Sequence, residues 1–139
     1  MSLKVVRTSR LAGFDWSPLL FALRAEGRRE AEELLGRLLA GGEEAWVWLL
    51  LGEREVLGAA VLRPEPCPDL VGAARLELLF LVPRVRGEGY GGELLVRVLK
   101  FARGRFRRVT AAAGEGEAGF LEHHGFVPFR HPCLTHFRP

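Results

Sequence analysis

Several residue types are scarce or missing in this chain of 139 residues. It contains no asparagine, glutamine or isoleucine, and Lys4 and Lys100 are its only lysines among 20 basic residues. Because amide side chains are among the first to be damaged by heat, their absence predicts a thermophilic source. Cys67 and Cys133 are the only cysteines. One disulfide could form, but two reduced thiols fit a cytosolic protein better.

Long apolar runs and a strong charge of one sign are missing too. No apolar run reaches the length of about 18 residues that a membrane-spanning helix needs. The first six residues lack the hydrophobic region and cleavage site of a signal peptide. The net charge is +3, and acidic and basic residues are mixed along most of the chain. We therefore expect a cytoplasmic protein with neither a membrane nor a nucleic acid as its partner.

Hydrophobic residues make up 48% of the chain, which is enough to bury a substantial core in one domain over residues 1–139. Their spacing predicts strands at 3–8, 45–51, 56–62, 75–82, 109–113, 126–129 and 134–137. A helix should begin at Ser17, as a cap before Pro18, and be interrupted at Gly27. Further helices are predicted at 30–39, after Gly92 and at 115–124, and the three prolines within 64–68 predict a loop.

The stretch from 76 to 95 is the most informative part of the sequence. An apolar strand runs into a basic, glycine-dense turn, and the turn opens directly into an amphipathic helix. The start of a helix carries unpaired N–H groups and partial positive charge, and glycines let an anion approach closely. Arg86 adds a charged fork that suits phosphate oxygens. The turn is therefore predicted to hold a phosphate or pyrophosphate.

One known pattern in this turn is G-x-G-x-x-G, formed by Gly87, Gly89 and Gly92. It is typical of dinucleotide-binding folds, where an acidic residue follows about 20 residues later. The region around Ala112 offers no such acid, and the chain after Gly92 is too short for the usual six-stranded dinucleotide fold. A nicotinamide-binding oxidoreductase is thus the weaker interpretation.

The other pattern is Arg86-x-x-Gly89-x-Gly91, preceded by a strand and Pro83 and followed by a helix. It closely resembles motif A of the GNAT family of acetyl-CoA-dependent N-acetyltransferases, over residues 76–126 and more loosely over the whole chain. The resemblance implies an α/β (α+β) fold, with a mixed, mostly antiparallel central sheet and helices on both faces. The predicted order of strands and helices agrees with that fold.

The resemblance also implies acetyl-CoA as co-substrate, bound between two splayed strands, with its pyrophosphate in the glycine turn. Backbone groups near the end of the central strand would bond the pantetheine arm and polarise the thioester carbonyl. The positions that it assigns to acetyl-CoA are Leu79, Phe80, Leu81, Val82, Arg86, Gly87, Glu88, Gly89, Tyr90, Gly91 and Gly92.

The implied reaction is direct attack of a primary amine on the thioester, with a base that removes the amine proton. The family's usual carboxylate position is Arg75 here, so Glu77, two residues further on the same strand face, is the candidate base. It could instead be a surface glutamate or a partner of Arg75. Arg28 and Arg29 could recognise an acidic group on the acceptor or belong to a solvated loop. The acceptor stays open among amino acids, polyamines, antibiotics, protein N-termini and lysine side chains.

The acid that protonates the departing thiolate in this family is often a tyrosine, and Leu121 occupies its position here. Glu115 stands where a pantetheine-binding asparagine is common, and the sole tyrosine, Tyr90, lies in the glycine turn. His123 and His124 flank the acid position and are the candidate proton carriers. These departures favour, as the alternative function, a non-catalytic CoA-binding sensor or partner-binding module.

Two further features concern metals and assembly. His131, Cys133 and His136 have spacing that suggests metal ligands, but strand geometry makes three convergent side chains improbable, and we expect no metal. Trp46 and Trp48 share one strand face. Together with the apolar C-terminal strand they predict a homodimer, because a small monomer would struggle to cover them.

Overall fold

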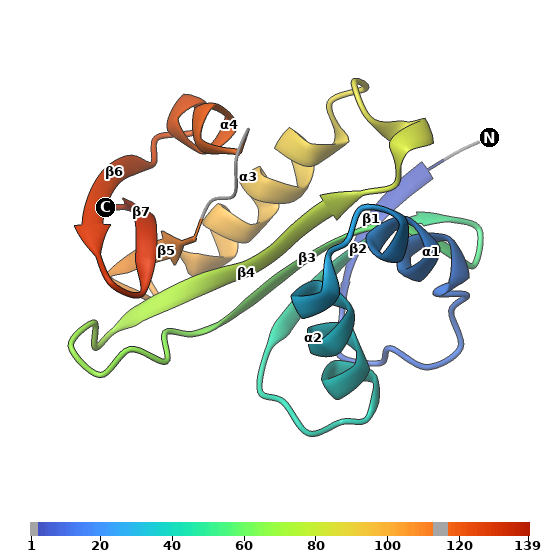
Figure 1. The fold of residues 1–139 in the computed structure, drawn as a ribbon, viewed down its shortest axis with the longest axis horizontal. Helices are drawn as coiled ribbons and strands as arrows, with labels where there is room; N and C mark the ends of the chain where they lie inside the picture. Colours follow the sequence, from blue (N-terminus) through green and yellow to red (C-terminus); the bar gives the residue numbers. More distant parts are fainter. Residues whose placement is uncertain (1–2, 113–116) are drawn as a thin grey trace.

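The computed structural model describes residues 3–112 and 117–139, which form one seven-stranded sheet with helices on both faces (Figure 1). In chain order the elements are β1 (Leu3–Thr8), α1 (Ser17–Ala25), α2 (Arg29–Leu39), β2 (Trp46–Gly52), β3 (Glu55–Pro64), β4 (Ala73–Leu81), the 3-10 turn η1 (Pro83–Val85), α3 (Tyr90–Ala102), β5 (Arg108–Ala111), α4 (Ala118–His123), β6 (Val127–His131) and β7 (Leu134–Arg138). No helix in these two ranges is long and apolar enough to cross a membrane.

The sheet has the strand order β1-β2-β3-β4-β5-β7-β6. Neighbouring strands run antiparallel except β4 and β5, which are parallel and are joined by the crossover through η1 and α3. A parallel pair needs such a long connection because the chain must return to the same end of the sheet. The sheet is therefore mixed and mostly antiparallel, which confirms the predicted fold class.

The core follows the apolar spacing of the sequence. Leu19 and Leu23 of α1 and Leu35 of α2 are fully buried on one face of the sheet, beside strands β2 and β3, whose central residues are buried. Leu94 and Val98, four residues apart on α3, are fully buried on the opposite face. In Figure 1, α3 passes behind β4, while α1 and α2 lie in front of the sheet.

The two tryptophans of β2, Trp46 and Trp48, pack against aromatic rings of the helix α3 and the segment after it. The Trp48 ring lies 5.3 Å from that of Phe101 on α3, and the Trp46 ring lies 5.4 Å from both Phe101 and Phe106. Trp48 is 3% exposed. Trp48 is therefore covered, Trp46 is only partly buried, and the expected homodimer is argued better from other residues.

The start of α1 differs in one detail from the sequence prediction. Ser17 is the first helical residue rather than the cap, and Asp15 Oδ1 accepts the hydrogen bond from its N–H at 3.0 Å. Hydrogen bonds from Ser17 lower the pKa of Asp15 below its usual value. Gly27 separates α1 from α2 with a φ of +69°, as its position in the sequence predicted. Residues 113–116 of the predicted strand 109–113 and helix 115–124, and with them Glu115, lie outside the described residues.

Candidate active site

The site begins where the sheet splits. β4 pairs with β5 from Ala73 to Leu76, and β4 then continues to Leu81 without β5 beside it. On its other edge β4 stays paired with β3 as far as Leu81. Backbone N–H and C=O groups that lose a strand partner need another one, so this edge of β4 is suited to bond an extended ligand.

A β-bulge marks the same point. Leu62 of β3 pairs with Leu76, while the preceding Val61 pairs with Leu78, so Glu77 is the extra residue. Bulges bend a strand and re-aim a side chain, and they are common beside active sites. The sequence alone did not reveal this bulge, because it depends on the register with β3.

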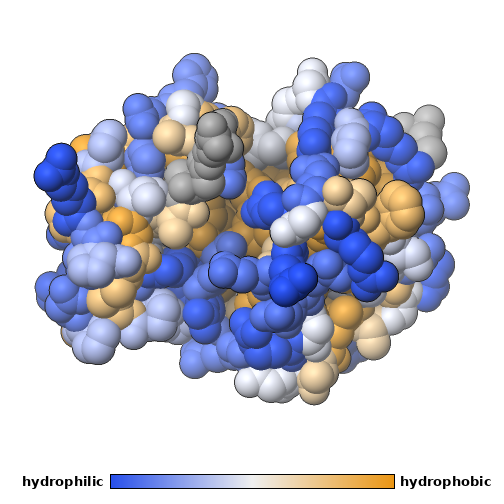
Figure 2. Space-filling model, in the orientation of Figure 1, coloured by the Kyte–Doolittle hydropathy of each residue, from blue (hydrophilic) through white to orange (hydrophobic). Residues whose placement is uncertain are grey.

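A cleft of about 670 Å³ opens along this edge. Figure 2 shows an apolar floor, in orange, between hydrophilic rims on this face. The walls come from β4, the glycine turn, α4 and the segment after α1. The lining residues are Glu26, Arg28, Leu76, Glu77, Leu78, Leu79, Phe80, Leu81, Arg86, Gly87, Gly89, Gly91, Gly92, Ala111, Ala112, Glu117, Phe120 and Leu121.

The positions expected to hold acetyl-CoA mostly line this cleft. Leu79, Phe80, Leu81, Arg86 and four glycines do so, namely Gly87, Gly89, Gly91 and Gly92. Val82, Glu88 and Tyr90 do not line it. Val82 is buried, and its N–H bonds to the carbonyl of Leu57 at 2.8 Å.

The glycine turn has the backbone that an anion site needs. Gly87 and Gly89 have φ values of +79° and +88°, and a Cβ on either would meet no atom within 4 Å. Glycine is therefore required by the left-handed backbone, and the turn faces open space. α3 starts at Tyr90, and its first intrahelical bond runs from Glu93 N to Gly89 O at 3.1 Å. The N–H groups of the preceding turn are left for a ligand.

Arg86 is fixed at the mouth of this turn. Its Nε donates to the carbonyl of Leu81 at 3.0 Å, and its Nη2 donates to Glu26 Oε2 at 2.7 Å. The guanidinium also lies 5.1 Å from the ring centre of Phe80. The charge is thus held between the end of β4 and the residue that follows α1, and an entering anion would compete with Glu26 for it.

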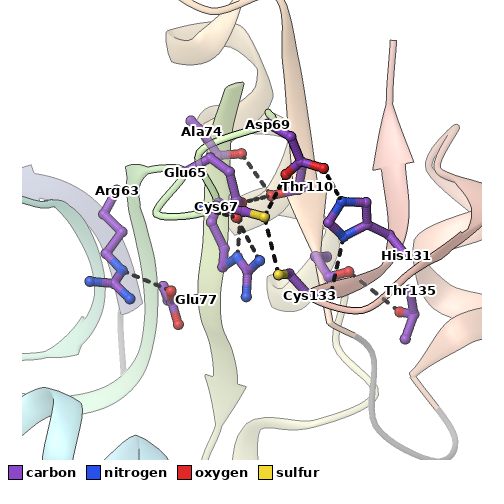
Figure 3. Close-up of polar contacts among 12 residues, drawn as sticks. Arg63, Glu65, Cys67, Asp69, Ala74, Glu77, Thr110, His131, Cys133 and Thr135 are labelled. Carbon is purple, nitrogen blue, oxygen red and sulfur yellow. Dashed lines mark hydrogen bonds and ion pairs between the residues drawn. The ribbon is translucent and has the colours of Figure 1, made fainter. Parts of the chain in front are cut away.

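Glu77 pairs with an arginine from the neighbouring strand. Arg63 Nε donates to Glu77 Oε1 at 2.7 Å, and the Glu77 side chain is 20% exposed (Figure 3). Within residues 3–112 and 117–139 no hydrogen bond reaches the second oxygen, Oε2. The suggested partner Arg75 instead makes two hydrogen bonds to Glu65, at 2.6 and 2.9 Å.

A second hollow of about 760 Å³ continues from the cleft. The two share Arg28, Leu76, Glu77 and Ala112 as lining residues. Arg29 and Arg75 line the second hollow as well, together with acidic residues of α2. Glu77 therefore stands at the junction of one space beside the glycine turn and another rich in charged side chains.

The short helix α4 brings an apolar side chain to the expected acid position. Leu121 lines the cleft and is 4% exposed. His124 Nδ1 lies 3.0 Å from the carbonyl of Phe120, and its ring faces Gly92. His123 is exposed, and neither histidine lines the cleft or the second hollow.

Comparisons with known proteins show the family of the chain and proteins of similar fold. A family model described as the acetyltransferase (GNAT) family matches residues 10–126. A search of curated proteins by sequence found no match. The fold is similar to that of a proposed acetyltransferase from Exiguobacterium sp. 255-15, with a TM-score of 0.84 and 21% identity over 99% of this chain and 93% of that one.

Two other similar structures contain ligands. A GNAT family acetyltransferase from Elizabethkingia anophelis with acetyl-CoA bound has a TM-score of 0.64 and 16% identity, over 98% of this chain and 97% of that chain. The PaiA N-acetyltransferase from Thermoplasma acidophilum, in complex with coenzyme A, has a TM-score of 0.68 and 15% identity, over 99% of this chain and 98% of that chain.

Proposed function

This chain belongs to the GNAT family of acetyltransferases, and from that premise we propose that it moves the acetyl group of acetyl-CoA to a primary amine by direct attack. The observation that carries the proposal is the opening of β4 away from β5 directly beside the glycine turn. A strand edge that needs hydrogen-bond partners and an anion site thus share one cleft.

The residues of the cleft fit acetyl-CoA in charge and shape. The free N–H groups at the start of α3 suit a pyrophosphate, and Arg86 can add a charged fork once its contact with Glu26 is exchanged. The edge of β4 from Leu79 to Leu81 suits the pantetheine arm, which carries amides of its own. Similar proteins with acetyl-CoA or coenzyme A bound support this assignment.

Glu77 is the proposed base. A carboxylate at the junction of the two hollows can take a proton from an amine in the second hollow, directly or through one water. Arg63 holds Oε1, so Oε2 is the oxygen that would accept the proton. Arg28 and Arg29 line the space on the acceptor side.

Protonation of the departing coenzyme A thiolate does not require a side chain as general acid. Its intrinsic pKa is near that of free cysteine, about 8.5, so the thiolate can depart and be protonated by solvent. Leu121 cannot donate a proton, and His123 and His124 lie outside the cleft lining. We assign the two histidines at most a minor part in this step.

The proposal is tested by measuring acetyl-CoA binding calorimetrically and free thiol release with a panel of amines. The panel should include amino acids, polyamines, an aminoglycoside and peptides with a free N-terminus or a lysine. Turnover that depends on one class of amine supports the transferase and identifies the acceptor. Binding without turnover across the panel favours the CoA-binding sensor or partner-binding module, and failure to bind acetyl-CoA contradicts both.

A further inference from the structure

A second group of reactive side chains lies where two distant segments meet, outside the cleft lining. The loop between β3 and β4 carries Cys67 and Asp69, and the β6–β7 hairpin carries His131 and Cys133 (Figure 3). The two sulfur atoms are 3.1 Å apart, and His131 Nε2 lies 2.9 Å from Asp69 Oδ2. One ligand atom from each of Cys67, His131 and Cys133 lies within 4.8 Å of the others.

This spacing suits a tetrahedral metal ion. Zn–S bonds of about 2.3 Å and Zn–N bonds of about 2.0 Å place two sulfurs and one nitrogen roughly 3.5–3.8 Å apart in a tetrahedron. The separations here, from 3.1 Å between the sulfur atoms to at most 4.8 Å, bracket that range. Small side-chain rotations would therefore complete the geometry. Two thiolates and an imidazole favour zinc over magnesium or calcium, which prefer oxygen ligands.

The contact of His131 with Asp69 matches that of a metal-binding histidine. The backbone N–H of Cys133 donates to Nδ1 at 3.0 Å, so in the neutral ring the proton is on Nε2 and is donated to Asp69. A carboxylate that holds the second ring nitrogen is the usual partner of a zinc-binding histidine. To bind a metal, Nδ1 would use the lone pair that now accepts the Cys133 N–H, and that N–H would then turn to solvent.

We propose that Cys67, His131 and Cys133 bind one Zn²⁺ ion, with Asp69 as the residue that positions His131 and water in the fourth place. Binding forms two Zn–S bonds and one Zn–N bond, and it releases the two thiol protons to solvent. His136, which the sequence spacing had suggested as a ligand, is turned away, because its Nε2 contacts Glu122 Oε2 at 2.8 Å. The expectation of no metal rested on that spacing and did not include Cys67.

The ion would stabilise one side of the second hollow. The N–H of Cys67 bonds to Glu65 Oε1 at 3.2 Å, and Glu65 in turn holds Arg75, which lines that hollow. A metal that ties this loop to the β6–β7 hairpin would therefore limit the movement of Arg75. The proposed ion has three protein ligands, and its existence does not depend on acetyl transfer.

The test is a titration of the reduced, chelator-treated full chain with Zn²⁺ and, as a coloured probe, Co²⁺. We expect one ion per chain and the sulfur-to-metal charge-transfer absorption that thiolate ligands give to Co²⁺. Cys67→Ser, Cys133→Ser and His131→Ala should each weaken binding at least tenfold, and Asp69→Asn should weaken it about 10–100-fold. His123→Ala, which removes an exposed histidine outside the cluster, is the matched control and should bind as the unchanged chain does.

Circular dichroism of each variant shows whether it is folded. A reduced, folded chain that takes up no stoichiometric ion, or that binds equally well in all the variants, would overturn the proposal. The zinc proposal would also be overturned if, in air and with one equivalent of Zn²⁺ present, Cys67 and Cys133 lost their free thiols by forming a disulfide. In that case the sulfur contact would be a redox pair rather than a metal site.

Discussion

Arg63 on β3 donates a hydrogen bond of 2.7 Å to Glu77 on β4, at the residue where a bulge interrupts the pairing of these two strands. Arg63 of β3 holds the Oε1 atom of Glu77. The Oε2 atom is left for the two hollows, which Glu77 lines. A side chain held in this way needs little reorganisation before it accepts a proton, which is what a positioned base requires.

If Glu77 is the base, Glu77→Gln should lower kcat by about 10²-fold or more while acetyl-CoA affinity stays nearly unchanged. Steady-state kinetics and calorimetry measure the two effects separately. Glu43→Gln is the matched control, since Glu43 also approaches Arg63, at 3.7 Å, but does not line the cleft or the second hollow. Full activity in Glu77→Gln would remove the base assignment and leave a water-only route.

Substitutions in the glycine turn should weaken acetyl-CoA binding more than they destabilise the fold. A charge-assisted contact to phosphate is worth about 1.5–3 kcal/mol, so Arg86→Ala should weaken binding by roughly 10–150-fold. Gly89→Val should be worse, because a φ of +88° strains a branched residue and its side chain would enter the anion's space. Calorimetric titration measures both.

Arg84→Ala is the control for that series. Arg84 lies two residues before Arg86, but it pairs with exposed Glu55 at 3.3 Å and does not line the cleft. Its loss should leave affinity unchanged. If Arg86→Ala and Gly89→Val also bind acetyl-CoA with unchanged affinity, the coenzyme A site has been assigned to the wrong turn.

The stability of the fold should depend on the ionisation of Glu65. Burial favours the neutral carboxyl, but hydrogen bonds from Arg75 and Thr110 outweigh it, and the pKa of Glu65 lies below its usual 4.5. A pKa lowered by folding contributes stability above the unfolded value, and this contribution is lost as the pH falls through the folded value. Denaturant unfolding of the metal-free chain should therefore show stability declining below about pH 4.5.

Removing the negative charge of Glu65 by mutation should likewise destabilise the fold at neutral pH. Glu65→Gln leaves Arg75, whose side chain is 13% exposed, without its anion, and should cost about 3 kcal/mol of unfolding free energy. The exposed pair of Arg84 and Glu55 provides the comparison, and Glu55→Gln should cost less than about 1 kcal/mol. If the two variants lose the same unfolding free energy, the buried pair stabilises the fold no more than the exposed pair does.

The histidines of α4 should matter little for catalysis. His123→Ala and His124→Ala should each reduce kcat by less than about tenfold, because the thiolate can leave unaided and neither ring lines the cleft. Rates measured at saturating acetyl-CoA test this directly. A collapse of activity in either folded variant would mean that a histidine delivers the proton after all.

A homodimer stays a prediction, now based on the edge of the sheet. β6 ends the strand order, and its Val127 and Phe129 are 43% and 38% exposed. Light scattering should give twice 15.5 kDa, and Phe129→Arg should shift the mass to that of one chain. Val71→Arg, at an 83% exposed position outside β6, should leave the dimer intact. A mass of 15.5 kDa for the unchanged chain would contradict the dimer.

Much of this molecule was determined locally, and those parts could be predicted. Apolar spacing and turn residues place every strand and helix within a few positions, as in the exact agreement of β1 with residues 3–8. The glycine turn was predictable because its backbone angles and the free N–H groups of α3 depend only on neighbouring residues. The thermophilic source and cytoplasmic location remain predictions from composition.

Contacts between distant residues were decided by the tertiary structure. With 20 basic and 17 acidic side chains, the sequence offers many ion pairs of equal chemistry, and only the strand register joins Arg63 to Glu77 and Arg75 to Glu65. The bulge at Glu77 and the meeting of Cys67 with Cys133 likewise depend on which segments pack together. Local propensities cannot predict such pairings, because these contacts form only when the whole chain packs its core.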